Sequence, residues 1–67
     1  MPLVQVSMAK GRSDEQIREL IHVIHDAMVN VAKAAPEAVS IIITEVEHDK
    51  WATADVTIAE KKAREVS

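Results

Sequence analysis

Residues 13–33, SDEQIRELIHVIHDAMVNVAK, decide the fold because they join a helix start signal to a long apolar stripe. Ser13 and Gln16 have the spacing of a capping box, in which each side chain satisfies a backbone donor of the other residue. Apolar residues then recur every three or four positions, as on one face of a helix; they are Ile17, Leu20, Ile21, Ile24, Ala27, Met28 and Val31. Pro36 follows, and a residue before proline avoids the helical conformation. The sequence therefore predicts a helix over residues 14–33.

Extended segments flank this helix on both sides. Residues 3–8 alternate, so that Val4, Val6 and Met8 share one face of a predicted strand. Residues 39–46 contain three consecutive isoleucines, which indicate a strand buried on both faces. A strand, a helix and a strand in this order form a β-α-β unit of the α/β class. Its strands are expected to be parallel, with a right-handed crossover.

The segment after the second strand is less regular. Residues 47–50 are typical of a turn, and residues 51–58 predict a short extended piece that is compatible with a hairpin. Residues 59–67 are charged, and two interpretations remain open for them: a last helical turn or a mobile tail.

The chain is expected to be one domain over residues 1–67, because this length leaves no room for a second core. It contains no cysteine for a disulfide and no cysteine–histidine spacing typical of structural zinc. A single helix covers only one face of the sheet, and the other predicted face is also apolar. Self-association, with subunits packed sheet to sheet, is therefore the expected means of stabilisation.

Composition argues against two classes of partner. The net charge is −3, basic residues are scattered, and Trp51 is the only aromatic residue, so nucleic-acid binding is disfavoured. No apolar run approaches the length of a membrane span, and the N-terminus lacks the pattern of a signal peptide. The sequence thus predicts a cytoplasmic protein with neither a nucleic-acid nor a membrane partner.

Pro2 follows Met1 directly and precedes the first predicted strand. If Met1 is removed, Pro2 becomes a secondary amine held at an ordered strand end. An apolar pocket disfavours the charged form of such an amine and lowers its pKa towards neutrality, which suits a general base. The structural alternative is that Pro2 starts an edge strand, where a missing N–H costs little.

Several of these features occur together in one known family. Pro2, the run Gly11 to Gln16, the single long helix, the run Ile42 to Glu45 and the aromatic Trp51 resemble the 4-oxalocrotonate tautomerase family. The resemblance runs nearly without gaps from Pro2 to about residue 54. It implies a two-layer subunit, a dimer with a four-stranded sheet, and a hexamer built as a trimer of dimers.

The resemblance also implies proton transfer without cofactor or metal. Pro2 matches the processed proline that moves a proton from an enol, or from a carbon beside a carbonyl, to a conjugated carbon. Arg12 matches the arginine that binds a substrate carboxylate, for which a planar charged fork is suited. Trp51 matches the aromatic residue that walls the pocket. The expected partner is therefore a small-molecule carboxylate.

Two departures from the family pattern affect the predicted site. Ser40 occupies the position of a second arginine that polarises the substrate's oxo group in many members. A hydroxyl donates one hydrogen bond but no charge, and the loss could remove several kcal/mol of transition-state stabilisation. Residues 52–55 replace a glycine-rich hairpin, which puts the geometry of that pocket wall in question.

The predicted function is keto–enol tautomerisation of a 2-oxo or 2-hydroxydienoate acid by an isomerase. Hydration or dehalogenation of an unsaturated acid at the same site, or a non-catalytic oligomeric binding module, are the alternatives. The three histidines carry no predicted role. His22 and His25 lie off the apolar stripe towards solvent and, even with Asp26, do not complete a metal site, while His48 is interpreted as a solvated turn residue.

Overall fold

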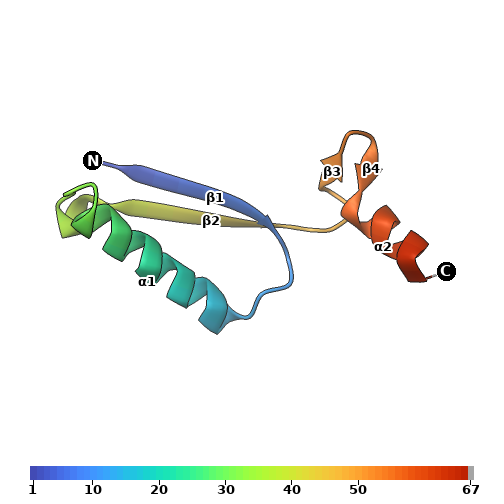
Figure 1. Cartoon of the computed structure of the whole chain (residues 1–67), viewed down its shortest axis with the longest axis horizontal. Helices are drawn as coiled ribbons and strands as arrows, with labels where there is room; N and C mark the ends of the chain where they lie inside the picture. The colour runs from blue at the N-terminus through green and yellow to red at the C-terminus, as the bar shows by residue number, and fades with distance from the viewer. Residues whose placement is uncertain (67) are drawn as a thin grey trace.

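The computed structural model describes residues 1–66 (Figure 1). Ser67, the end of the expected tail, lies outside the described residues. The elements follow in the order β1 (Leu3–Ala9), α1 (Asp14–Asn30), the 3₁₀ helix η1 (Pro36–Ala38), β2 (Ser40–Val46), β3 (Ala52–Thr53), β4 (Val56–Thr57) and α2 (Ile58–Val66). The first and second strand boundaries lie within one residue of the prediction.

Strands β1 and β2 form a parallel pair, in register from Leu3 opposite Ser40 to Ala9 opposite Val46. Helix α1 returns along one face of this pair, so the predicted β-α-β unit is confirmed (Figure 1). The other sheet face is open in the chain: Leu3 is 54% exposed and Ile42 is 48% exposed. Alternation places these two side chains on the side opposite the helix, where they share the uncovered face with Gln5, Ser7, Ser40 and Thr44. The sheet thus has one covered apolar face and one uncovered face that is partly apolar.

The predicted capping box starts α1. The backbone N–H of Gln16 donates to Ser13 Oγ at 3.2 Å, and the backbone N–H of Ser13 donates to Gln16 Oε1 at 2.9 Å. Asp14 and Glu15 occupy the first turn, where their negative charge interacts favourably with the positive end of the helix dipole. The local sequence thus accounts for where the helix begins.

The predicted end of this helix at Lys33 is wrong, because α1 ends at Asn30. Lys33 adopts a left-handed conformation with φ 58°, and the N–H of Ala34 donates to the carbonyl of Met28 at 3.1 Å. The 17 residues of α1 rise about 25 Å, close to the roughly 23 Å of a seven-residue strand. A helix of this length already returns the chain to the start of β2, and Val31, expected on the apolar stripe, is 81% exposed.

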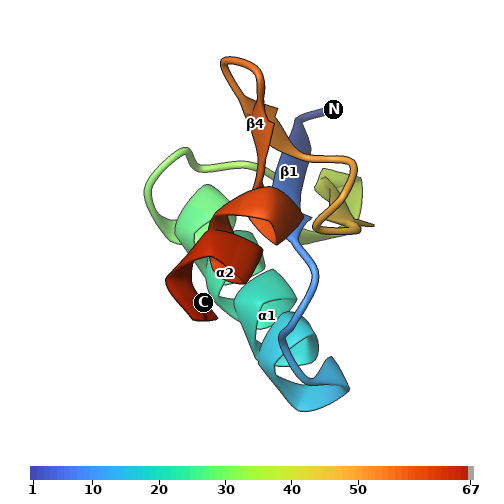
Figure 2. The ribbon, with the colours of Figure 1, turned by 90° about the vertical axis from the view of Figure 1, so that its right-hand side faces the viewer.

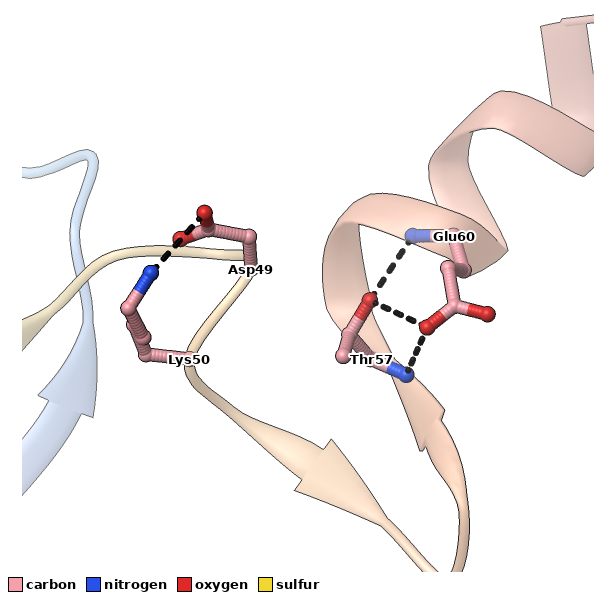
Figure 3. Close-up of polar contacts among 4 residues, drawn as sticks. All are labelled: Asp49, Lys50, Thr57 and Glu60. Carbon is pink, nitrogen blue, oxygen red and sulfur yellow. Dashed lines mark hydrogen bonds and ion pairs between the residues drawn. The ribbon is translucent and has the colours of Figure 1, made fainter.

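The C-terminal segment forms a hairpin followed by a helix. Strands β3 and β4 pair antiparallel around Ala54 and Asp55, which confirms the hairpin, and Ala54 takes φ 57° in its turn. Of the two open interpretations for the last segment, the helical one is correct over residues 59–66, and α2 is longer than one turn. A second capping box starts it, because the N–H of Glu60 donates to Thr57 Oγ1 at 3.1 Å and the N–H of Thr57 donates to Glu60 Oε1 at 3.3 Å (Figure 3).

The hairpin and α2, residues 52–66, form an arm that lies beyond one end of the sheet (Figure 1). Seen from that end, α2 stands in front of the β-α-β unit (Figure 2). The radius of gyration is 15.7 Å, against about 11 Å expected for a compact domain of this length. Among residues 1–65, whose side chains are described, none is fully buried. The fold therefore has an apolar layer between α1 and the sheet but no closed core within one chain.

Candidate functional site

Pro2 and Ser40 lie together at the amino-terminal end of the two parallel strands. The backbone N–H of Ser40 donates to the carbonyl of Pro2 at 3.0 Å, one position before Leu3 opens the strand ladder. Pro2 is half-buried, whereas Met1 is fully exposed. In the chain with Met1 attached, the nitrogen of Pro2 belongs to an amide and has no basicity. The strand pair thus holds the proline backbone in place and leaves its N-terminal side open.

Arg12 lies at the opposite end of β1. Its Nη1 atom donates to the carbonyl of Ala9 at 3.2 Å, so the side chain folds back over its own loop. Gly11 has φ 143°, and a Cβ at that position would meet no atom within 4 Å. The turn requires glycine for its backbone conformation rather than for space. The exposed guanidinium is therefore presented at the carboxyl-terminal end of the sheet.

Trp51 follows β2 at this same end. A turn closed by the Lys50 N–H on the Glu47 carbonyl, at 2.9 Å, leads into it. The Trp51 carbonyl then accepts the N–H of Ile58 at 2.9 Å, which fixes its backbone against the first residue of α2. The indole is half-buried. It is the only aromatic side chain in the sequence, so it is the only large flat apolar surface available to a ligand.

The four predicted site residues fall into two groups within one chain. Pro2 and Ser40 belong to the amino-terminal end of the strands, while the loop of Arg12 and the segment of Trp51 leave the carboxyl-terminal end. A seven-residue strand separates these ends by about 23 Å. A single subunit therefore presents two separate half-sites, and no small substrate can contact both of them.

His48 ties the two segments of the second half-site together. Its Nε2 atom lies 2.7 Å from the carbonyl of Lys10, and its own carbonyl accepts the N–H of Ala59 at 3.1 Å. His48 lies in a turn, as predicted, but its side chain is half-buried and hydrogen-bonded, so the interpretation of it as solvated is wrong. Nothing in the local sequence identified this role, because the bond joins residues that are 38 positions apart.

Two ion pairs lie at this end of the sheet. Lys10 Nζ is 2.8 Å from Glu47 Oε1, and the hydrogen bond and charge of Glu47 raise the pKa of Lys10. Asp49 Oδ2 is 3.0 Å from Lys50 Nζ, and the hydrogen bond and charge of Lys50 lower the pKa of Asp49 (Figure 3). All four side chains are more than half exposed, so solvent screens both pairs. They place paired charges at this end of the sheet without burying any of the four side chains.

An open cleft of about 320 Å³ lies between α1 and β2, and its lining includes none of the four predicted site residues. It is lined by Arg18, Ile21, His22, His25, Val39 and Ile41. His25 is half-buried, with Nε2 2.9 Å from the carbonyl of Pro36, which corrects its predicted position towards solvent; His22 is exposed as expected. Among residues 1–66, no three histidine, aspartate or glutamate side chains group so as to hold a metal ion.

Within the same described residues, no helix is both long enough and apolar enough to cross a membrane.

Comparison with curated proteins gives close matches over most of the chain. A protein of Halalkalibacterium halodurans named as a probable tautomerase is 33% identical over 61 residues, which are 91% of this chain and 100% of that protein. A probable tautomerase of Staphylococcus epidermidis is 34% identical over 56 residues, covering 84% of this chain and 92% of the relative.

Solved structures agree with the sequence relatives. A 4-oxalocrotonate tautomerase isozyme from Methylibium petroleiphilum superimposes with a TM-score of 0.89 at 30% identity, covering 94% of this chain and 98% of its own. A heterohexameric 4-oxalocrotonate tautomerase from Chloroflexus aurantiacus gives a TM-score of 0.83 at 32% identity, with 90% and 97% covered. The family model described as a tautomerase enzyme matches residues 2–61. With the β-α-β unit, the hairpin and nearly the whole length in agreement, the chain belongs to the tautomerase family.

Proposed function

We propose that this single-domain protein is a keto–enol tautomerase acting on a 2-oxo or 2-hydroxydienoate acid. Pro2 is the general base and general acid once Met1 has been removed. The observation that carries the proposal is the position of Pro2, whose carbonyl accepts the Ser40 N–H while the Met1 bonded to its nitrogen is fully exposed. The family model matches from this residue onward, and removal of Met1 would make Pro2 the N-terminal residue.

The chemistry needs one group that both accepts and returns a proton. The neutral secondary amine of Pro2 takes the proton of the enol hydroxyl, and the resulting ammonium delivers it to a conjugated carbon of the substrate. The electron pair of the O–H bond becomes the π bond of the new C=O group, and the π pair of the enol C=C bond shifts along the conjugated chain to form the C–H bond at the carbon that receives the proton. The product is the keto tautomer, and the neutral amine is regenerated. An apolar pocket assists by disfavouring the ammonium form before substrate binds. No cofactor or metal takes part in this scheme.

Assembly of the two half-sites requires more than one copy of the chain. If two copies associate with antiparallel sheets, the Pro2 end of one lies beside the Arg12 end of the other. The guanidinium of Arg12 then binds the substrate carboxylate and the indole of Trp51 excludes water. The extended arm and the open face of Leu3 and Ile42 support such an association. The proposed assembly is a homohexamer, a trimer of dimers, located in the cytoplasm and serving aromatic degradation.

Ser40 is proposed as a weak hydrogen-bond donor to the substrate's oxo group. Its side chain is exposed and its backbone lies next to Pro2. Because a hydroxyl does not supply the charge of an arginine, we expect modest catalysis with broad substrate acceptance.

The decisive experiment combines the intact mass of the purified protein with ketonisation of 2-hydroxymuconate and enol-phenylpyruvate. We expect a mass without Met1 and a rate above that of buffer. Pro2→Ala should lower kcat by about 10²-fold or more, since a positioned general base contributes on this scale. Arg12→Ala should mainly raise KM, because it removes binding of the carboxylate.

Three outcomes would contradict the proposal in different ways. If the wild type ketonises these substrates no faster than buffer does, the tautomerase activity is rejected and the non-catalytic binding module is the remaining alternative. Full activity in Pro2→Ala would reject the proposed base. Turnover of unsaturated or halogenated acids in place of ketonisation would indicate hydration or dehalogenation.

A further inference from the structure

The peptide units around Lys10 are held by three separate hydrogen bonds. The Lys10 N–H donates to the carbonyl of Val46 at 2.9 Å, which extends the strand ladder by one step. The Lys10 carbonyl is bonded to His48 at 2.7 Å, and the preceding carbonyl, that of Ala9, accepts the guanidinium of Arg12. Gly11 follows, and glycine has the widest conformational freedom of any residue. Lys10 is thus the last fixed point before the flexible turn that carries Arg12.

His48 connects this fixed point to the segment of Trp51. The residue lies within the turn that precedes Trp51, and its carbonyl accepts the N–H of Ala59 in the first turn of α2. His48 therefore links three segments: its imidazole bonds the Arg12 loop at Lys10, its backbone belongs to the segment leading to Trp51, and its carbonyl bonds the arm at Ala59. Without this side chain, the Lys10 N–H would still bond the Val46 carbonyl and the Ala59 N–H would still bond the His48 carbonyl. The remaining side-chain contact between the Arg12 loop and the turn would be the exposed Lys10–Glu47 ion pair, which solvent screens.

From these contacts we propose that His48 is a positioning residue for carboxylate binding, which rests on the function proposed above. It holds the Arg12 loop at a fixed distance from Trp51, so that the guanidinium of Arg12 and the indole of Trp51 contact the same ligand. A carbonyl oxygen only accepts hydrogen bonds, so Nε2 of His48 carries the proton in this contact. A glutamine at position 48 can offer an amide N–H from a similar distance, whereas asparagine is one carbon shorter.

The test compares His48→Ala, His48→Gln and His48→Asn in the intact protein, with His22→Ala as the matched control. His22 is an exposed histidine on α1, outside both half-sites. For ketonisation of 2-hydroxymuconate we expect His48→Ala and His48→Asn to raise KM by about tenfold, with kcat changed less than about twofold, because uniform binding is lost. His48→Gln and His22→Ala should stay close to the wild type.

A double-mutant cycle separates positioning from general destabilisation. If His48 acts through Arg12, His48→Ala should add no further increase in KM to the Arg12→Ala protein. A purely structural role would lower activity equally in both backgrounds. The Gln and Asn variants, which keep a polar side chain at position 48, provide the same comparison if His48→Ala does not fold.

Binding can also be followed without turnover, because Trp51 is the only tryptophan and there is no tyrosine. Titration with cis,cis-muconate, a dicarboxylate without an oxo or hydroxyl group, should change the fluorescence of Trp51 in the wild type. His48→Asn should weaken this binding about tenfold relative to His48→Gln.

The outcomes distinguish this inference from the proposed function. An inactive wild type that binds muconate with the expected His48 dependence would reject the tautomerase activity and keep the positioning role. If the wild type is active and the KM values of His48→Ala and His48→Asn equal that of His22→Ala, the positioning role alone is rejected. An effect of His48→Ala that persists undiminished in Arg12→Ala would also reject it.

Discussion

The β-α-β unit, residues 3–46, and the arm, residues 52–66, are built by different kinds of contact. In the β-α-β unit, strands from opposite ends of the segment pair in register over seven residues, and α1 covers one face of the pair. In the arm, the strands pair over two residues each, and the bonds of the α2 cap join residues three apart. The first region is held by long-range contacts and the second mainly by local ones.

This difference indicates which region depends on assembly. An isolated two-stranded hairpin is marginal in water, and a helix of nine residues is shorter than those that persist alone. Within the described chain, the arm is attached to the rest mainly through the backbone bonds of His48 and Trp51. We infer that the arm obtains its stability from a neighbouring copy, and that the β-α-β unit supplies the open sheet face on which copies meet.

The largest expected effect comes from placing a charge on that open face. Ile42→Lys puts an ammonium on this face in place of an apolar side chain that is 48% exposed in the single chain. Burying an unpaired charge is strongly unfavourable, so we expect the dissociation constant of the assembly to rise by at least about 10²-fold. Sedimentation analysis across a concentration series measures this directly.

Val23→Lys is the control, since Val23 is 53% exposed on α1, away from the open sheet face. It should leave the assembly unchanged. Dissociation by both variants to the same extent would show that the open face has no special part in the assembly. Retention of the assembly by Ile42→Lys would contradict the proposal directly.

The β-α-β unit was largely predictable because its signals are local and periodic. The Ser13 capping box and the apolar spacing identified α1, and the parallel strands followed from the order of elements. The end of α1 was not predictable from propensity, because the length of the paired strands sets where the chain must return. The second capping box, Thr57 and Glu60, has the same general signature of Ser or Thr followed three residues later by Glu or Gln, and it could have been identified from the sequence.

The candidate site was less predictable than the fold. Pro2, Arg12, Trp51 and Ser40 came from the family resemblance, and no local pattern indicates that they separate into two half-sites. The contact between His48 and Lys10 depends on how the carboxyl-terminal ends of β1 and β2 meet. Such contacts exist only once the strands are in register, so they become visible only with the structure.

The two capping boxes allow a direct comparison of the stability of the two regions. The expected loss of stability on removing a cap lies between the effects of the charge substitution and of the glycine substitutions. Loss of a cap costs about 1 kcal/mol, so Ser13→Ala should lower the global free energy of unfolding by about this amount. Thr57→Ala removes the equivalent bonds from α2. If the arm opens separately, its effect should appear as faster amide hydrogen exchange in residues 58–66, with little change in the global value. Equal global losses from both variants would show that the two regions unfold together.

The smallest expected effect concerns two non-glycine residues in left-handed conformations, one in each part of the chain. Lys33 has φ 58° after α1, and Ala54 has φ 57° in the hairpin turn. This conformation costs a residue with a side chain about 1–2 kcal/mol, while glycine adds about 0.5–1 kcal/mol of chain entropy to the unfolded state. Glycine at either position should therefore stabilise its surroundings by about 0.5 kcal/mol.

Lys33→Gly should raise the free energy of unfolding measured in urea, because the turn after α1 has to form for β2 to pair with β1. Ala54→Gly should instead slow amide hydrogen exchange in the hairpin. It should raise the free energy of unfolding measured in urea only if the arm unfolds together with the β-α-β unit. Thr53→Gly is a suitable control in the hairpin, since it introduces glycine into β3 without relieving a left-handed residue, and it should destabilise. A gain from Thr53→Gly equal to that from Ala54→Gly would show that added flexibility, rather than relief of the left-handed conformation, produces the effect.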